Sequence, residues 1–108
     1  MSDVVKLVET CPACPEQYDV HFRGRLVGYL RLRYGVFRAD YYDRELGQLT
    51  CYRAKPKGQG RFADDERGVY LTKACHAILQ EVSPDTELKG LKYEFASLCR
   101  VVGEDINY

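Results

Sequence analysis

The stretch that decides the fold consists of Tyr18-Asp-Val-His-Phe22, Leu26-Val-Gly-Tyr-Leu-Arg-Leu-Arg33 and Val36-Phe-Arg-Ala-Asp-Tyr-Tyr42, with Gly24 and Gly35 between its three segments. Apolar and polar residues alternate within each segment, and Tyr, Val, Leu and Phe are abundant, which is typical of β-strands. A glycine between two alternating segments favours a tight turn. The stretch therefore predicts three consecutive antiparallel strands.

The register of these strands follows from requiring their apolar side chains to share one face. A two-residue turn at Tyr34-Gly35 and a three-residue loop at 23–25 both meet this requirement. The predicted pairs are Leu32–Phe37, Leu30–Ala39, Gly28–Tyr41, Phe22–Leu26, Val20–Gly28 and Tyr18–Leu30. Because both turns place the same residues on one face, we expect a three-stranded meander.

Shorter patterns predict the remaining elements. Residues 49–54 and 4–8 are expected to add a fourth and a fifth strand, although their register does not follow from the pattern. The acidic run Asp64-Asp65-Glu66 suits the start of a helix. The apolar residues that then recur at helical spacing are Leu71, Cys75, Ile78, Leu79 and Val82.

A second helix is predicted over about 84–102. Ser83-Pro84 suits a helix start, and the residues that would share its apolar face are Leu88, Leu91, Phe95, Leu98 and Val102. A strand from Tyr93 to Val102 is the alternative, but its alternation would place Arg100 beside Leu98.

We therefore expect one α+β domain over residues 1–108. Its antiparallel meander of four to five strands would occupy about 4–54, and two helices in about 64–103 would cover one sheet face. At 108 residues and 12.4 kDa, the chain is too short for a nucleotide-binding doubly wound sheet or a (β/α)8 barrel.

The charge is balanced overall but not along the chain. The sequence has 16 Lys and Arg against 16 Asp and Glu, which excludes binding through bulk charge. Residues 1–63 carry 11 basic and 7 acidic side chains, a net +4, and residues 64–108 carry 5 and 9, a net −4. The predicted sheet is thus basic and the predicted helices are acidic, so recognition by a local patch stays open.

The compartment is expected to be the cytoplasm. Charged residues at 3, 6 and 9 interrupt the apolar stretch that a secretory signal needs, and no apolar run approaches the roughly 18 residues of a membrane span. The five cysteines are therefore expected to be reduced.

The first candidate site is the sheet face that the core does not use. The predicted register gives it three rows, Gln17–Arg31–Arg38, Asp19–Tyr29–Asp40 and His21–Val27–Tyr42, extended by Arg33. Residues 18–54 contain seven Arg and no Lys, and guanidinium groups grip phosphate or carboxylate through two hydrogen bonds. The face could bind an acidic partner or unpaired bases. The alternative is a solvated face with exposed ion pairs of little consequence.

The second candidate is Cys11-Pro-Ala-Cys14. Two thiolates at this spacing can share a zinc ion, but no second half of a zinc site is present. A structural turn or a redox pair are the alternatives. No cofactor is expected otherwise.

The third candidate is Gly58-Gln-Gly-Arg-Phe-Ala63, which matches G-x-G-x-x-A before a helix. A nucleotide- or acyl-CoA-dependent transferase would hold a pyrophosphate there. The acidic run that follows would repel phosphate, and no parallel strand is expected after the helix. We expect a basic loop whose Lys55, Lys57 and Arg61 add to the arginine surface.

No catalytic set of residues is evident, so no enzyme is expected. The two histidines offer few groups for acid–base chemistry, and His76 diverges from its neighbour Cys75 on a helix. Cys75 and Cys99 are expected to be small core residues.

Four segments resemble short uncharacterised proteins of phages and prophages, over roughly residues 11–82. These segments are Cys14-Pro-Glu-Gln-Tyr-Asp-Val20, Val27-Gly-Tyr-Leu-Arg-Leu-Arg33, Gly58-Gln-Gly-Arg-Phe62 and Asp65-Glu-Arg67. The resemblance implies no activity. It implies an accessory protein that binds a host complex, for instance to inhibit a defence nuclease.

The leading hypothesis is a small binding or inhibitor protein that recognises a protein or nucleoprotein complex with an acidic or phosphate-bearing surface. The residues expected to bind the partner are Tyr29, Arg31, Arg33, Arg38, Tyr42, Lys55, Lys57 and Arg61. A nucleic-acid-binding regulator that uses the same face and a zinc domain built on Cys11 and Cys14 are the alternatives. A homo-oligomer formed through the oppositely charged halves is also open.

Overall fold

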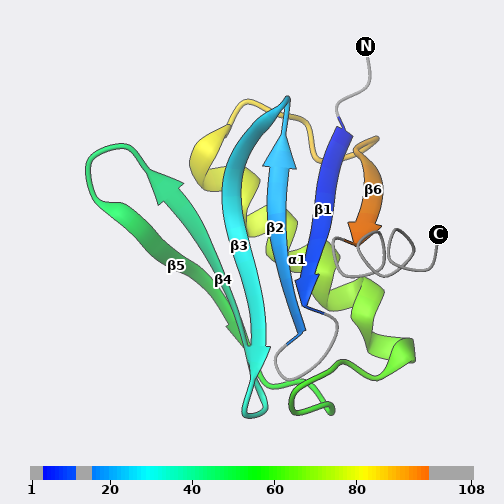
Figure 1. Ribbon diagram of the computed structural model, residues 1–108. Coiled ribbons are helices and arrows are strands. Elements are labelled where there is room, and N and C mark those ends of the chain that lie inside the picture. The colour runs from blue at the N-terminus through cyan, green and yellow to red at the C-terminus, as the bar shows by residue number, and fades with distance from the viewer. Residues whose placement is uncertain (1–3, 12–15, 98–108) are drawn as a thin grey trace, which may run out of the picture.

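The computed structural model describes residues 4–11 and 16–97, which form a six-stranded sheet with one helix against it (Figure 1). The sheet order is β5-β4-β3-β2-β1-β6. The α+β class is confirmed, with six strands and one helix in this part of the chain instead of the expected four to five strands and two helices. The elements are β1 (Val4–Cys11), β2 (Glu16–Phe22), β3 (Arg25–Arg33), β4 (Val36–Asp43), β5 (Gly47–Ala54), α1 (Asp64–Val82) and β6 (Lys92–Ser97).

The central meander has the predicted register at five of the six pairs. The exception is at the β2–β3 turn, where Phe22 lies opposite Arg25 and a bulge after Val20 restores the register. A two-residue turn with both residues in the left-handed region, Arg23 at φ 53 and Gly24 at φ 76, replaces the expected three-residue loop. Such turns match the twist of the strands. As a result Val27 is buried, not on the open face as predicted.

Strand β6 replaces the second predicted helix. It pairs in parallel with β1, so that Val5 lies opposite Tyr93 and Leu7 opposite Phe95. Polar Lys92 and Glu94 alternate with these two aromatics at the strand period. This pairing also satisfies the backbone N–H and C=O groups at the outer edge of β1. The helical spacing of the apolar residues in 84–102 gives no sign of such a pairing. Residues 98–102 of the predicted helix lie outside the described residues.

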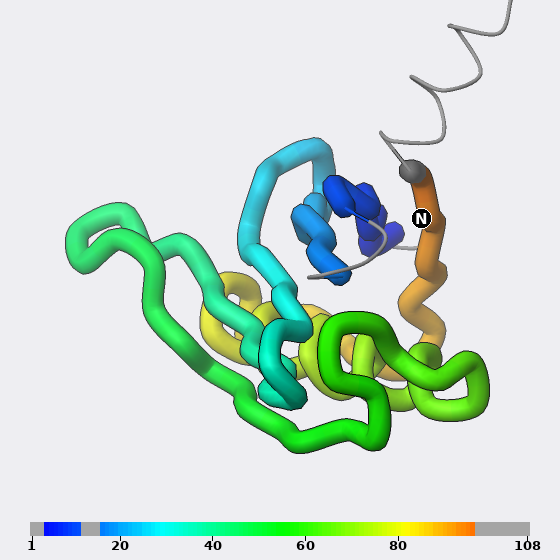
Figure 2. The backbone as a smooth tube through the Cα atoms, turned by 60° about the horizontal axis from the view of Figure 1, so that its bottom comes forward, coloured from blue at the N-terminus to red at the C-terminus, as the bar shows by residue number. Residues whose placement is uncertain are grey.

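Helix α1 crosses one face of the sheet and joins β5 at one edge to β6 at the other. In Figure 2 the sheet curves over α1, which lies on one side of it. The predicted apolar helix face is confirmed, because Leu71, Ala74, Cys75, Ile78 and Leu79 are buried. The sheet residues of the core with no exposed surface are Val5, Leu7, Val20, Leu30, Leu32, Phe37 and Ala39.

A glycine in β3 allows the helix to approach the sheet. A Cβ atom on Gly28 would lie 2.6 Å from Ile78 Cδ1 and 2.7 Å from the backbone oxygen of Asp40. Both distances are shorter than van der Waals contact, so only glycine fits between α1 and β4 at this point. The close approach holds α1 on one side of the central strands.

Candidate binding surface

The sheet face opposite α1 carries the predicted binding surface. Side chains alternate along each strand, so this face receives the residues between the core positions. No helix of the described ranges covers it, because α1 packs on the other face. Its polar and aromatic members in the region of interest are Gln17, Asp19, Tyr29, Arg31, Arg33, Arg38, Asp40, Thr50 and Arg53.

Three arginines lie directly opposite one another on adjacent strands. Arg31 of β3 is paired with Arg38 of β4, as predicted, and Arg38 with Arg53 of β5. Directly opposite residues have Cβ atoms about 5 Å apart, and like charges at that spacing destabilise a sheet. We call Arg31, Arg38 and Arg53 the arginine row.

Only Arg38 of the arginine row has a carboxylate partner within the described residues. Its Nε lies 3.3 Å from Asp40 Oδ1, which is an ion-pair distance, but the buried Nε–H has no hydrogen-bond acceptor. Asp40 instead accepts hydrogen bonds from the Gln48 amide at 2.6 Å and the Thr50 hydroxyl at 2.7 Å. Asp40 of β4 is thus held by hydrogen bonds to β5. Since it is one carboxylate beside three arginines, the arginine row keeps an excess of positive charge.

A hollow of about 250 Å³ opens on this face beside the β3–β4 turn. No acidic side chain lines it. Each guanidinium group presents a fork of N–H donors suited to carboxylate or phosphate oxygens, and three such groups surround one depression. The lining residues are Arg31, Arg33, Tyr34, Val36 and Arg38.

Tyr34 projects from the turn at the rim of this hollow. Its side chain is 83% exposed, and its φ of 54° lies in the left-handed region, which aromatic residues rarely adopt. The Arg33 guanidinium lies 4.9 Å from the centre of the Tyr34 ring and donates a hydrogen bond of 3.3 Å to its hydroxyl. The hairpin therefore displays an aromatic ring where Asn or Gly would suit the backbone better.

Two other predicted aromatics lie on the same face, farther from the hollow. Tyr29 is half-buried and lies between Asp19 and Asp40 in the adjacent row, while Tyr42 is 36% exposed. Burial raises the pKa of both hydroxyls. They therefore remain neutral hydrogen-bond donors at physiological pH.

The basic loop is tied to the helix side of the molecule. The Lys57 ammonium lies 2.8 Å from Asp65 Oδ2 in α1. Arg67, hydrogen-bonded to Asp64, and to a smaller extent Arg61 lower the pKa of the Asp64 carboxyl. The loop borders the β3–β4 turn, because the Gly35 N–H donates a hydrogen bond of 2.7 Å to the backbone oxygen of Gln59. Lys57 nevertheless does not line the hollow beside that turn. Lys55 and Arg61 are exposed.

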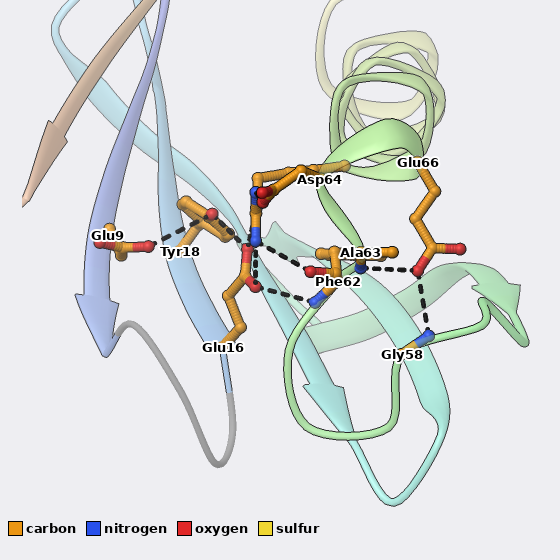
Figure 3. Close-up of polar contacts among 9 residues, drawn as sticks. Glu9, Glu16, Tyr18, Gly58, Phe62, Ala63, Asp64 and Glu66 are labelled. Atoms are coloured by element: carbon orange, nitrogen blue, oxygen red, sulfur yellow. Dashed lines mark hydrogen bonds and ion pairs between the residues drawn. The ribbon is translucent and has the colours of Figure 1, made fainter.

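A carboxylate of α1 closes the glycine-rich loop (Figure 3). Glu66 accepts hydrogen bonds from the backbone N–H groups of Lys57 at 2.8 Å, Gly58 at 3.0 Å and Ala63 at 2.9 Å. Burial opposes the ionised form, but the three donors outweigh it and lower the pKa of Glu66. A phosphate bound at this loop would need the same donors. A parallel strand does follow the helix, contrary to expectation, but β6 pairs with β1 and the loop already holds its own anion.

A second carboxylate fastens β2 to the start of α1 (Figure 3). Glu16 is 1% exposed, and its Oε2 lies 2.9 Å from Arg67 Nε and 2.5 Å from the Tyr18 hydroxyl. Its Oε1 accepts the Phe62 N–H at 3.0 Å. Hydrogen bonding to Glu16 raises the pKa of Arg67, and burial raises that of Tyr18. Arg67 therefore stays charged and Tyr18 neutral near neutral pH, and their bonds with Glu16 hold the loop before α1 against the sheet.

Three of the five cysteines, Cys11, Cys51 and Cys75, lie in the part of the chain that the structure describes. Cys75 is buried as predicted, and burial raises its thiol pKa to about 12. Burial likewise raises the pKa of Cys51 to about 11. Cys11 ends β1, whereas Cys14 and Cys99 lie outside the described residues, so the zinc site stays a prediction. Within residues 4–11 and 16–97, no three His, Cys, Asp or Glu side chains gather in a metal-binding group.

Two residues of the binding surface were not predicted from the sequence. Arg53 joins the arginine row only because a bulge at Cys51 sets the register of β5, and a six-residue pattern does not reveal a bulge. Tyr34 was assigned to the turn alone. An aromatic residue in a position that favours Asn was the available signal.

Comparisons with known proteins identify no relative, since no family model, no curated protein and no solved structure matches the chain. The resemblance to phage and prophage proteins stays a prediction. Of the helical segments described, none is long and apolar enough to cross a membrane.

Proposed function

We propose that this chain is a non-enzymatic binding protein whose arginine row and adjoining hollow hold an acidic or phosphate-bearing group of a macromolecular partner. The observation that supports it best is the pairing of Arg31 with Arg38. Like charges directly opposite one another cost stability, and no described carboxylate lies within ion-pair distance of Arg31 to offset that cost. An anion supplied by a partner would offset it.

Composition and shape support the same proposal. Arg and Tyr are the residues in which binding energy concentrates at interfaces, and the arginine row, Tyr29 and Tyr42 lie on the one sheet face that α1 leaves uncovered. Residues 1–63 carry a net +4 and residues 64–108 a net −4. This asymmetry would orient an acidic partner toward the sheet before contact. The partner we propose is a protein or nucleoprotein complex, such as the host complex implied by the phage resemblance.

The test is affinity capture from host lysate with the full chain and its Arg31→Glu/Arg38→Glu variant. The matched control is Arg25→Glu/Arg44→Glu, which changes the net charge equally at exposed positions outside the arginine row. We expect the first variant to capture at least about tenfold less of the partner, which corresponds to the loss of one or two charge-assisted hydrogen bonds. Its melting temperature should change little.

Nuclease treatment of the lysate separates the two kinds of partner. A partner retained after nuclease is a protein, and one lost after nuclease is held through nucleic acid. Equal capture by both charge-reversal variants would refute the proposed surface. Steep loss of binding with added salt would be expected if phosphates make the contacts.

A further inference from the structure

We propose that the hollow beside the β3–β4 turn is a site for the terminal phosphate of a single-stranded nucleic acid, whose end base stacks on Tyr34. This inference rests on the proposed function and narrows it to one ligand chemistry. It is carried by the charge around the hollow, by the free donors of its guanidinium groups and by the conformation of Tyr34.

The charge around the hollow matches a dianion. Arg31, Arg33 and Arg38 line it, and Asp40 is the one described carboxylate within ion-pair distance of any of them. Two positive charges are therefore left over. A phosphomonoester carries a charge of about −1.5 to −2 at pH 7, whereas a carboxylate or an internal phosphodiester carries one negative charge. The terminal phosphate is the group that balances the site.

The guanidinium donors of the hollow are largely unused. An arginine has five N–H donors, yet neither Arg31 nor Arg38 donates a hydrogen bond to any residue that the structure describes. Arg33 donates one to the Tyr34 hydroxyl. The two β3 arginines and Arg38 of β4 approach from two strands, which suits the several oxygens of a phosphate better than a planar carboxylate.

Tyr34 identifies the source of the phosphate. The residue is 83% exposed and contributes little to the core, and its φ of 54° costs about 1 kcal/mol for a residue with a side chain. Apart from its exposed contact with Arg33, the fold gives no reason for an aromatic residue at this position. Stacking of a nucleic-acid base on such a ring contributes about 1–3 kcal/mol. An aromatic ring beside a phosphate-sized hollow favours a nucleotide end over a phosphopeptide or free phosphate.

The primary experiment measures fluorescence anisotropy of the full chain with one short single-stranded oligonucleotide, labelled at its 3′ end, that carries either a 5′-phosphate or a 5′-hydroxyl. We expect at least about tenfold tighter binding of the phosphorylated strand. Arg31→Gln should remove this preference, and inorganic phosphate should compete for the site. Equal affinity for the two strands overturns the inference.

Tyr34→Asn tests the stacking separately from folding. This variant should bind the phosphorylated strand about tenfold more weakly while its melting temperature stays equal or rises, because Asn accepts the left-handed conformation. Tyr34→Phe should bind as the original chain does. The matched control is Arg23→Asn, at the equivalent position of the β2–β3 turn with φ 53, which should leave the affinity unchanged.

A phosphoserine peptide of equal length completes the test. Weak binding of this peptide supports a nucleic-acid ligand, whereas affinity equal to that of the phosphorylated strand overturns it. If the strand fails to bind but capture of a nuclease-resistant partner still depends on Arg31 and Arg38, the inference is wrong and the proposed function stands. If capture is also independent of these arginines, both are wrong.

Discussion

The two faces of the sheet differ in how far their charged side chains are paired. On the helix side, the carboxylates of Glu16 and Glu66 accept hydrogen bonds from backbone N–H groups of the loop before α1, and Glu16 also accepts one from Arg67 (Figure 3). On the open side, Arg31 and Arg38 lie opposite each other, and Asp40 offsets one of them. Charges that are buried and paired hold this fold together, whereas the unpaired charges make no such contribution and are available to a partner.

The largest effect is expected from Glu16→Ala. Removing this carboxylate leaves the buried Phe62 N–H without its acceptor and leaves Arg67 with Asp64 and the Phe62 carbonyl as its remaining partners. Breaking a buried ion pair costs about 3–5 kcal/mol, and because Arg67 keeps these partners we expect about 3 kcal/mol. Urea denaturation at neutral pH measures the free energy of unfolding. Glu45→Ala, at an exposed position of the β4–β5 turn, is the control and should change it by less than about 0.5 kcal/mol. A loss for Glu16→Ala as small as that of the control would break the comparison between the faces.

A smaller, pH-dependent effect is expected from Glu66→Gln. The pKa of Glu66 is lowered in the folded protein, so its carboxylate stabilises the fold at pH values above the unfolded pKa of about 4.3. That contribution is lost as the pH falls through the lower folded pKa. The difference in unfolding free energy between the original chain and the variant should therefore be constant near neutral pH and shrink in acid. Urea midpoints at several pH values measure it, with exposed Glu87→Gln as control. A difference that grows in acid would contradict the assignment.

The smallest effect on stability is expected from Arg31→Gln. Because Arg31 has no described carboxylate partner and faces Arg38, its removal should leave the unfolding free energy within about 0.5 kcal/mol, on the stabilising side at low salt. Salt screens the repulsion, so the advantage of the variant should fade as salt is added. Melting temperatures of both chains over a salt series provide the measurement. Clear destabilisation would show that Arg31 serves the fold instead of a partner.

The prediction of the meander succeeded because two turns impose the same constraint. The positions of Leu30 and Gly28 satisfy both neighbouring strands at once, so the alternation of residues 18–42 leaves one register. The arginine surface follows from that register, and Arg31 opposite Arg38 was predicted correctly. Where a single turn decided the pairing, at Arg23 and Gly24, the local prediction was wrong.

The prediction of the C-terminal region failed because its partner is distant along the chain. Leu88, Leu91 and Phe95 have helical spacing, but Lys92–Ser97 lies beside β1, about 90 residues earlier. Only tertiary structure brings this edge within reach. The same holds for Arg53, whose place in the arginine row depends on a bulge against β4.

The sequence by itself determined the α+β class, most of the register of the three central strands and the place of Arg31, Arg38 and Tyr29 on one face, because alternation and turn residues act over a few positions. The tertiary structure alone decided that Glu66 fills the glycine-rich loop and that Glu16 meets Arg67. It also decided that Arg53 of β5 joins the arginine row. These contacts depend on how separate elements pack. Packing is set by the whole core, and a local sequence pattern does not predict it.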